Sequence, residues 1–176
     1  YQLHNLGGGT AKTVFASIIS RYQDPDGDLG ISDEGWEIAA KFLGNAHNIA
    51  DGEDAVGSVI DGTYPMDEHW ASGVLTEQKD RDYKFQIMTP DIGEPYVVES
   101  LAISAGTKKY DTCVAFLNWL GSSDVQLDWS NNYGTIPCQK EALDQVSDDI
   151  KELMETLKPQ DLDWSFIAEN VDAWVE

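Results

Sequence analysis

Apolar residues along the chain recur mostly at the three- and four-residue spacing of amphipathic helices, and only briefly at the two-residue spacing of strands. The first stripe consists of Val14, Phe15, Ile18, Ile19 and Tyr22 and predicts a helix from Thr10 onward. Further stripes predict a helix ended by Gly44, a short helix between Asp51 as N-cap and Gly62, helices over 110–120 and 123–133, and two helices near the C-terminus. Their apolar positions are Trp36, Ala39, Ala40 and Leu43; Ala55, Val56, Val59 and Ile60; Cys113, Phe116, Leu117 and Leu120; Val125 and Trp129, expected to face inward; Ile150, Leu153, Met154 and Leu157; and Trp164, Ile167, Val171 and Trp174.

Strand patterns are confined to the middle of the chain. The stretch "TYPMDEHW" reads as an extended segment, "DYKFQIMTP" alternates apolar and polar residues, and "YVVESLAIS" reads as a buried strand. Helices return after these segments. We therefore expect an α/β or α+β fold with more helix than strand.

Composition and charge narrow the range of partners. The 176 residues are 41% hydrophobic and include six tryptophans, enough to fill the core of one domain or of two small ones. With 11 basic and 32 acidic residues, the net charge is −21, which opposes binding to nucleic acid or to an anionic membrane surface. No apolar run approaches the ~20 residues of a membrane span. The chain opens on "YQLHNL" without an initiating methionine, and we expect it to be a fragment of a longer precursor.

Three consecutive glycines precede the first predicted helix in "NLGGGTAKT". A phosphate-binding P-loop requires glycines where Leu6 and Ala11 stand if Lys12 and Thr13 are its last two residues, so the motif fails. A weaker possibility remains, because the free amides of a helix start attract an anion such as a carboxylate or phosphate. The alternative is a flexible entry loop with Thr10 as an ordinary N-cap.

The acidic run "DPDGDLGISDEG" partly matches a calcium-binding EF-hand loop. Asp24, Asp26, Asp28 and Ile31 fit the pattern, but Leu29 replaces the turn glycine and Gly35 replaces the bidentate glutamate. A calcium-stabilised extracellular interaction domain is therefore an alternative class for this protein. The other interpretation of the run is an acidic surface turn.

Other candidate chemistry is weak. His4, His47 and His69 are far apart in the sequence and lack metal-ligand spacing, so no metal site is predicted. Cys113 shares a stripe with apolar residues, which favours a buried thiol over a disulfide with Cys138. No nucleophile motif is present. We therefore expect no enzyme and no cofactor.

Six stretches in order resemble the bacterial extracellular solute-binding proteins of ABC importers, in particular the ferric-iron and sugar-phosphate type. They are the glycine-threonine helix start, "EGWEIAAKFLGNA", "VIDGTYPMDEHW", "TPDIGEPYVVESLAIS", "YDTCVAFLNWLGSSDVQLDWSNNYGTIP" and the ending "LKPQDLDWSFIAENVDAWVE".

The resemblance implies an α/β fold of the periplasmic-binding-protein type II kind, with two lobes and solute held between them. The chain resembles the C-terminal half of such a protein. Residues 5–80 match a segment of the second lobe, and residues 81–176 match crossover strands and helices returning to the first. The ligand-binding residues implied are Gly8, Gly9, Thr10 and Ala11 at the helix start, and Glu68 and Trp70 after "DGTYP".

The same resemblance implies a non-catalytic component that captures ferric iron or an anionic solute such as a sugar phosphate. Its partners would be ABC permease subunits and the missing N-terminal lobe. Its location would be extracellular or periplasmic, with a membrane anchor outside this chain. Glu68 could instead pair with a buried cation and Trp70 could be a core residue. Tyr64 stands alone beside Pro65, whereas ferric-type relatives often carry paired tyrosines.

Overall fold

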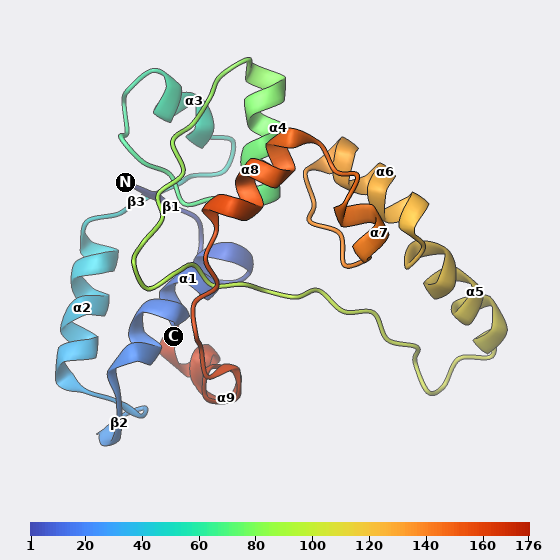
Figure 1. Ribbon diagram of the computed structural model, residues 1–176. Helices are drawn as coiled ribbons and strands as arrows, with labels where there is room; N and C mark the ends of the chain where they lie inside the picture. The colour runs from blue at the N-terminus through green and yellow to red at the C-terminus, as the bar shows by residue number, and fades with distance from the viewer. The chain divides into compact units, whose positions relative to one another are not determined.

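The computed structural model describes residues 1–176, which form two compact units. Unit 1 comprises Tyr1–Trp70 together with Pro159–Glu176, and unit 2 comprises Ala71–Lys158. Figure 1 shows the elements of both units. None of the helices combines the length and the apolar character that a membrane span requires.

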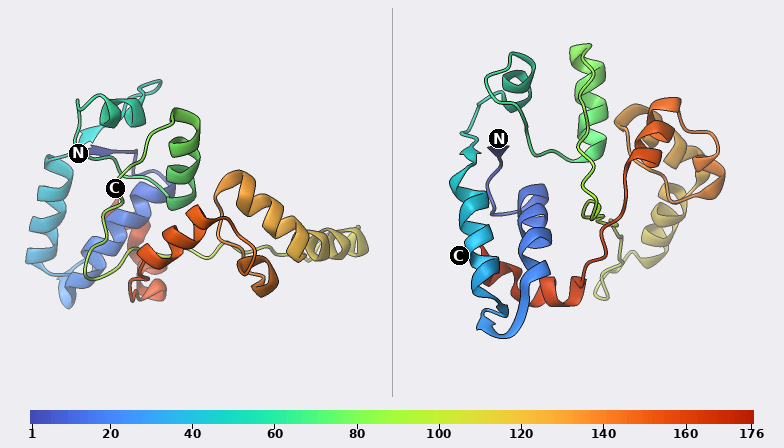
Figure 2. Two further views of the ribbon diagram at one scale, coloured as in Figure 1. Left: turned by 45° about the horizontal axis from the view of Figure 1, so that its top comes forward. Right: turned by 60° about the vertical axis from the view of Figure 1, so that its left-hand side comes forward.

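Unit 1 is built around helix α1, which packs against α2 and against α9 from the far end of the chain. The two turned views in Figure 2 show α2 beside α1. Seven buried residues from these helices and one loop form the core, and five of them belong to three of the predicted stripes. The elements are β1 (Gln2–Leu3), α1 (Gly9–Ile19), η1 (Ser20–Tyr22), β2 (Gln23–Asp28), α2 (Asp33–Gly44), β3 (His47–Asn48), α3 (Ala55–Ile60) and α9 (Trp164–Trp174), and the core residues are Phe15, Ala16, Ile19, Ile31, Ala39, Ile167 and Trp174.

Local hydrogen bonds begin the helices of unit 1 and tie α9 to the rest. The Ser32 hydroxyl caps α2, and the Asp163 carboxylate caps α9 by accepting from the Ser165 and Phe166 amides. The indole Nε1 of Trp174 donates to the carbonyl of Leu29 over 3.1 Å. Trp174, from the last predicted stripe, therefore fills the core of unit 1.

Strand β1 is the only element of unit 1 with extended chain on both edges. It pairs in parallel with β3, in the register Gln2 with His47 and Leu3 with Asn48. On its opposite edge, the amide of Gln2 donates to the carbonyl of Met66 over 3.0 Å, and Gln2 forms a parallel bridge with Asp67. Both residues of β1 are buried. The segment that follows "DGTYP" is therefore held beside β1.

Unit 2 is helical, with α6 in contact with α4, α5 and α7. A small set of residues near its C-terminal end is fully buried, namely Ala142, Val146, Ile150 and Leu153. Gly134 ends α6 in the left-handed conformation (φ 68°), where an added Cβ would meet Leu75 of α4. The helices are α4 (Ala71–Arg81), α5 (Tyr110–Leu120), α6 (Ser123–Tyr133), α7 (Lys140–Leu143) and α8 (Asp148–Thr156).

The two strands predicted in the middle of the chain do not form. Residues 83–104 contain no strand, and Val97, Val98 and Leu101 of the expected buried strand are exposed. In Figure 1 this stretch is an extended line without ribbon before α5. A strand needs neighbours that complete its ladder of hydrogen bonds, and no neighbouring strand lies beside these residues. Their β-branched composition alone is insufficient.

Three smaller expectations also differ from the structure. The N-cap of α3 is Asp54, which accepts from the amide of Gly57 over 3.0 Å, and not Asp51. Trp129 is exposed instead of facing inward. Cys113 is a free thiol that is only partly buried, whereas we expected a buried one. The other predicted helices are present within a few residues of their expected bounds.

Candidate functional site

The start of α1 is exposed and has no side-chain cap. Gly8 occupies the N-cap position in an extended conformation (φ 179°), and Gly9 adopts φ 63°, in the region that favours glycine. A Cβ at either glycine would meet no atom within 4 Å. The helix begins at Gly9, so Thr10 lies inside the first turn and the side chain of Ala11 points into the protein.

This turn has the properties of an anion site supplied by the main chain. Amides of a first helical turn lack partners within the helix and lie at the positive end of its dipole. The preceding amide, of Gly7, is already bonded to Asn5 Oδ1 at 2.6 Å. Lys12 is in an ion pair with Asp172, so its charge is already matched. The turn could accept a carboxylate or a phosphate through its amides alone.

A second group of polar side chains lies beside β1. The parallel bridge between Gln2 and Asp67 places His4 near His69, two residues further along each segment. Because side chains alternate along extended chain, Asp67 and His69 point to one face and Glu68 to the other. The rings of His4 and His69 have centroids 6.4 Å apart.

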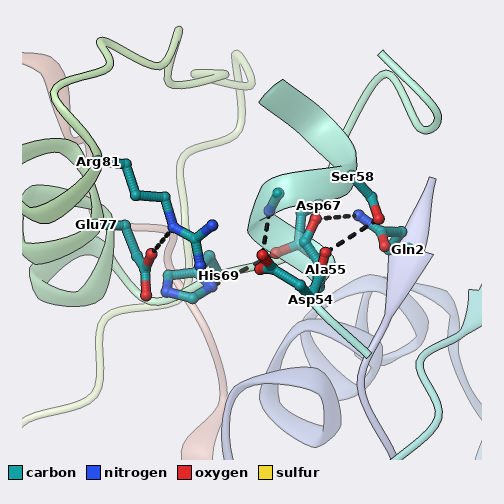
Figure 3. A network of polar contacts seen from close by, with 9 residues as sticks. Gln2, Asp54, Ala55, Ser58, Asp67, His69, Glu77 and Arg81 are labelled. Carbon is teal, nitrogen blue, oxygen red and sulfur yellow. Dashed lines mark hydrogen bonds and ion pairs between the residues drawn. The ribbon is translucent and has the colours of Figure 1, made fainter. Parts of the chain in front are cut away.

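The atoms of this group are close enough to share one ligand. Figure 3 draws the contact between His69 and Asp67, whose Nδ1 and Oδ2 atoms lie 3.5 Å apart. One ligand atom from each of His4, Asp67 and His69 falls within 4.8 Å of the others. The Asp67 side chain is only 8% exposed and that of His69 14%. We call these three residues the histidine–aspartate cluster.

Most polar atoms of the cluster are buried without a hydrogen-bond partner. They are Nε2 of His4, both carboxylate oxygens of Asp67 and Nδ1 of His69, and the neighbouring Oε1 of Gln2 is in the same state. The Gln2 side chain is held in place because its Nε2 donates to the carbonyl of Ala55 over 2.9 Å, a contact drawn in Figure 3. Unpaired buried polar atoms cost free energy, so this concentration in one place indicates a site for a ligand.

Glu68 is shielded from water next to the cluster. Burial raises the pKa of its carboxyl group to about 7, and the charge of Asp67 adds to the increase, while His69 and the His4 main chain partly oppose it. Both oxygens of Glu68 are buried from solvent. Trp70, in contrast, is exposed and stacks on His69 with ring centroids 4.3 Å apart.

Sequence reasoning therefore named the two neighbours of the cluster, Glu68 and Trp70, and missed its members. Separation along the chain argued against a joint role for His4 and His69, and the structure brings them together. The D-x-H spacing within "MDEHW" was a usable indication, since it puts Asp67 and His69 on one face of extended chain. The partner segment carrying His4 could not be read from the sequence.

The acidic loop does not assemble a comparable site. Asp24, Asp26 and Asp28 do not converge as a set of metal ligands. Instead, Asp24 Oδ1 accepts from the amide of Asp26 at 3.0 Å, and the amide of Asp24 donates to the carbonyl of Gly30 at 2.9 Å. These bonds describe a closed turn that leads into α2.

Comparison with known proteins places the chain in a family. Residues 7–158 match the model of the bacterial extracellular solute-binding protein family. Over all 176 residues the chain is 30% identical to the probable ABC transporter periplasmic-binding protein y4fP of Sinorhizobium fredii, and it spans 49% of that relative. No solved structure gives a significant match. The chain belongs to the bacterial extracellular solute-binding protein family.

Proposed function

We propose that this chain is part of the substrate-binding component of an ABC importer, which captures a small polar solute outside the cytoplasmic membrane and delivers it to permease subunits. Family membership and the name of the Sinorhizobium fredii relative support this role. The chain spans about half the length of that relative, so the activity of the whole protein is an inference. The role is one of binding without catalysis.

We further propose an anionic solute such as a sugar phosphate, bound at the start of α1. The observation that carries this is the exposed first turn of α1, with an N-cap glycine, no side-chain cap and open space at Gly8 and Gly9. Thr10 would add its hydroxyl, and Ala11 its amide. Glu68 and Trp70, on the segment that follows "DGTYP", are the further proposed ligand-binding residues.

Ferric iron is the less favoured solute. Fe³⁺ is a hard cation that would need several anionic oxygen donors, as in sites with paired tyrosines. Tyr64 lies against the ring of His47, with centroids 4.6 Å apart and planes 16° from parallel. Tyr1, also in unit 1, packs its ring against Phe42 and not against Tyr64.

The mechanism would be closure of two lobes around the solute. Contacts from both lobes favour the closed state, which the permease then recognises. In this proposal residues 5–80 belong to the second lobe, and residues 81–176 lead back toward the first. One side of the cleft alone would bind the solute weakly, so the test should use millimolar concentrations of solute.

The test is a thermal-shift and calorimetric titration with glucose 6-phosphate and inorganic phosphate, against glucose as the uncharged reference. We expect the anions to raise the melting temperature and glucose to leave it unchanged. Gly8→Leu should abolish the shift, because an extended φ and open space allow the new side chain to cover the amides without strain. Gly44→Leu is the matched control, since Gly44 also faces open space at the far end of α2. Equal shifts in both variants would contradict the proposed anion site.

A further inference from the structure

We propose that His4, Asp67 and His69 bind a divalent transition-metal ion of the Zn²⁺ class, through Nε2 of His4, a carboxylate oxygen of Asp67 and Nδ1 of His69. This proposal goes beyond solute capture and does not depend on it. The site would lie wholly within unit 1, between the end of β1 and the segment that follows "DGTYP".

The donor set determines the class of metal. Two imidazole nitrogens and one carboxylate oxygen suit Zn²⁺ and its neighbours in the first transition row, whereas Ca²⁺ and Mg²⁺ take oxygen ligands. Three protein ligands with a fourth position open to water form a recurrent zinc arrangement. The buried Oε1 of Gln2 is available next to the cluster to accept a hydrogen bond from such a water.

The geometry requires only small side-chain movements. Ligand atoms around one tetrahedral zinc lie ~3.3 Å apart, given bonds of about 2.0–2.1 Å. Asp67 Oδ2 and His69 Nδ1 are already 3.5 Å apart, and the widest separation in the cluster is at most 4.8 Å. Rotation about the terminal torsion of histidine, which has a broad energy minimum, can close the remainder.

Two independent observations indicate that the site is built for a ligand. The first is that Asp67 is more than nine-tenths buried while neither of its oxygens has a hydrogen-bond partner. The second is that the donor atoms of His4 and His69 face it, also buried and unpartnered. An ordinary buried ion pair would satisfy its hydrogen bonds, and this group does not. A metal ion would satisfy all three residues at once.

The backbone reinforces the arrangement. Main-chain contacts hold the two ligand-bearing segments together. The amide of Gln2 donates to the carbonyl of Met66, and Gln2 forms a parallel bridge with Asp67. His69 is further held by stacking on Trp70, with planes 13° from parallel. Bound metal would therefore join two segments that are far apart in the sequence, and it should stabilise unit 1.

The test measures zinc binding by calorimetry on the tag-free chain after treatment with a chelator, in phosphate-free buffer. We expect one Zn²⁺ per chain, with a melting temperature that rises with Zn²⁺ and does not change with equal Mg²⁺ or Ca²⁺. Asp67→Asn and His69→Gln should each weaken Zn²⁺ binding at least tenfold. His47→Gln is the matched control, because His47 pairs with Glu53 at 2.7 Å and lies outside the cluster, so it should bind as the parent does.

A second readout keeps the proposal testable if a cluster variant folds poorly. Co²⁺ bound to the parent chain should give the visible absorption of a four-coordinate nitrogen and oxygen site, and Zn²⁺ should displace it. Gly8→Leu should bind both metals normally, which separates a failure here from a failure of the anion site. Absence of one-to-one binding at a Zn²⁺ concentration of about 0.1 mM, or equal loss in the His47 variant, would overturn the proposal.

Discussion

Unit 1 and unit 2 differ in how far their helices bury apolar side chains. In unit 1, helices α1, α2 and α9 place one stripe each into a common core, and Phe15, Ile19 and Ile31 are completely enclosed. In unit 2, helix α5 buries no residue at all, and Phe116, Trp119, Trp129 and Tyr133 are exposed. Both sets of helices have amphipathic sequences. An amphipathic stripe therefore predicts a helix without showing that its apolar face finds a partner in the same chain.

The two units also differ in the kinds of side chains and main-chain groups that they expose. The uncapped start of α1 and the histidine–aspartate cluster both lie in unit 1, close to β1 and its neighbours. Unit 2 instead displays exposed aromatic pairs, such as Phe116 with Trp119, whose centroids are 5.7 Å apart. Unit 1 therefore carries the candidate binding groups, whereas unit 2 carries exposed aromatic side chains on α5 and α6.

The largest expected effect comes from matched truncations of two phenylalanines. Phe15→Ala should lower the free energy of unfolding by about 3–5 kcal/mol, because a side chain that is 1% exposed leaves a cavity. Phe116→Ala should cost less than about 1 kcal/mol, because Phe116 is 51% exposed. Urea denaturation followed by circular dichroism measures both. Equal losses would contradict the contrast between the units.

The second prediction concerns the exposed aromatic face of unit 2. The chain made alone should self-associate through this face or melt at low temperature, since apolar patches of this kind drive association. Trp119→Glu should shift the chain toward monomer in sedimentation velocity, because it charges an exposed position on α5. Trp164→Glu is the control in unit 1, where an exposed tryptophan at the start of α9 should have no such effect. A parent chain that is monomeric and stable at all concentrations would show that the face needs no partner.

The third prediction uses the pKa of Glu68 in the metal-free protein. A folded pKa of about 7 lies above the ordinary 4.5, so the folded chain holds a proton that the unfolded chain has released between these values. Stability should therefore fall as pH rises from about 4.5 to 7. Glu68→Gln should remove this dependence and be more stable at pH 8 by no more than about 2 kcal/mol, a value that allows for partial screening of the charge by water near this residue. Chemical denaturation with a chelator present tests this, and an unchanged pH profile in the variant would contradict it.

The smallest expected effect concerns the cap of α9, which closes the core of unit 1. Asp163→Ala removes the acceptor of two main-chain amides, at 3.1 Å from Ser165 and 3.0 Å from Phe166, and should cost about 1 kcal/mol. Asp161→Ala, two residues earlier and also exposed, should have no measurable effect on unfolding. A similar loss in both variants would mean that general charge, and not the cap, stabilises α9.

Local pattern explains which parts of the fold could be predicted. Each of the helices α1 and α9 has an apolar stripe that can be seen within its own segment, and both helices form. The stripe of α1 includes Phe15 and Ile19, and that of α9 includes Ile167 and Trp174. Helix α4 was missed because it carries few apolar residues. The expected strand around Val98 required a pairing partner that its own residues do not specify.

In the candidate site, too, features made by adjacent residues could be predicted, and features that need a distant segment could not. The glycine-rich start of α1 was visible because adjacent residues create it. The cluster was not, because His4 meets Asp67 and His69 only through parallel pairing of two distant segments. Glu68 and Trp70 were reached through resemblance to a family, which identified the segment but not which of its side chains meet His4.

Amide hydrogen exchange followed by mass spectrometry tests the contrast between the units most directly. At micromolar protein concentration, peptides covering α1, α2 and α9 should exchange slowly and together, near the rate set by global unfolding. Peptides covering residues 83–104 and α5 should exchange much faster, because few of their side chains are buried. Uniform protection across α1 and α5 would contradict the account, since it would mean that unit 2 is as firmly packed as unit 1.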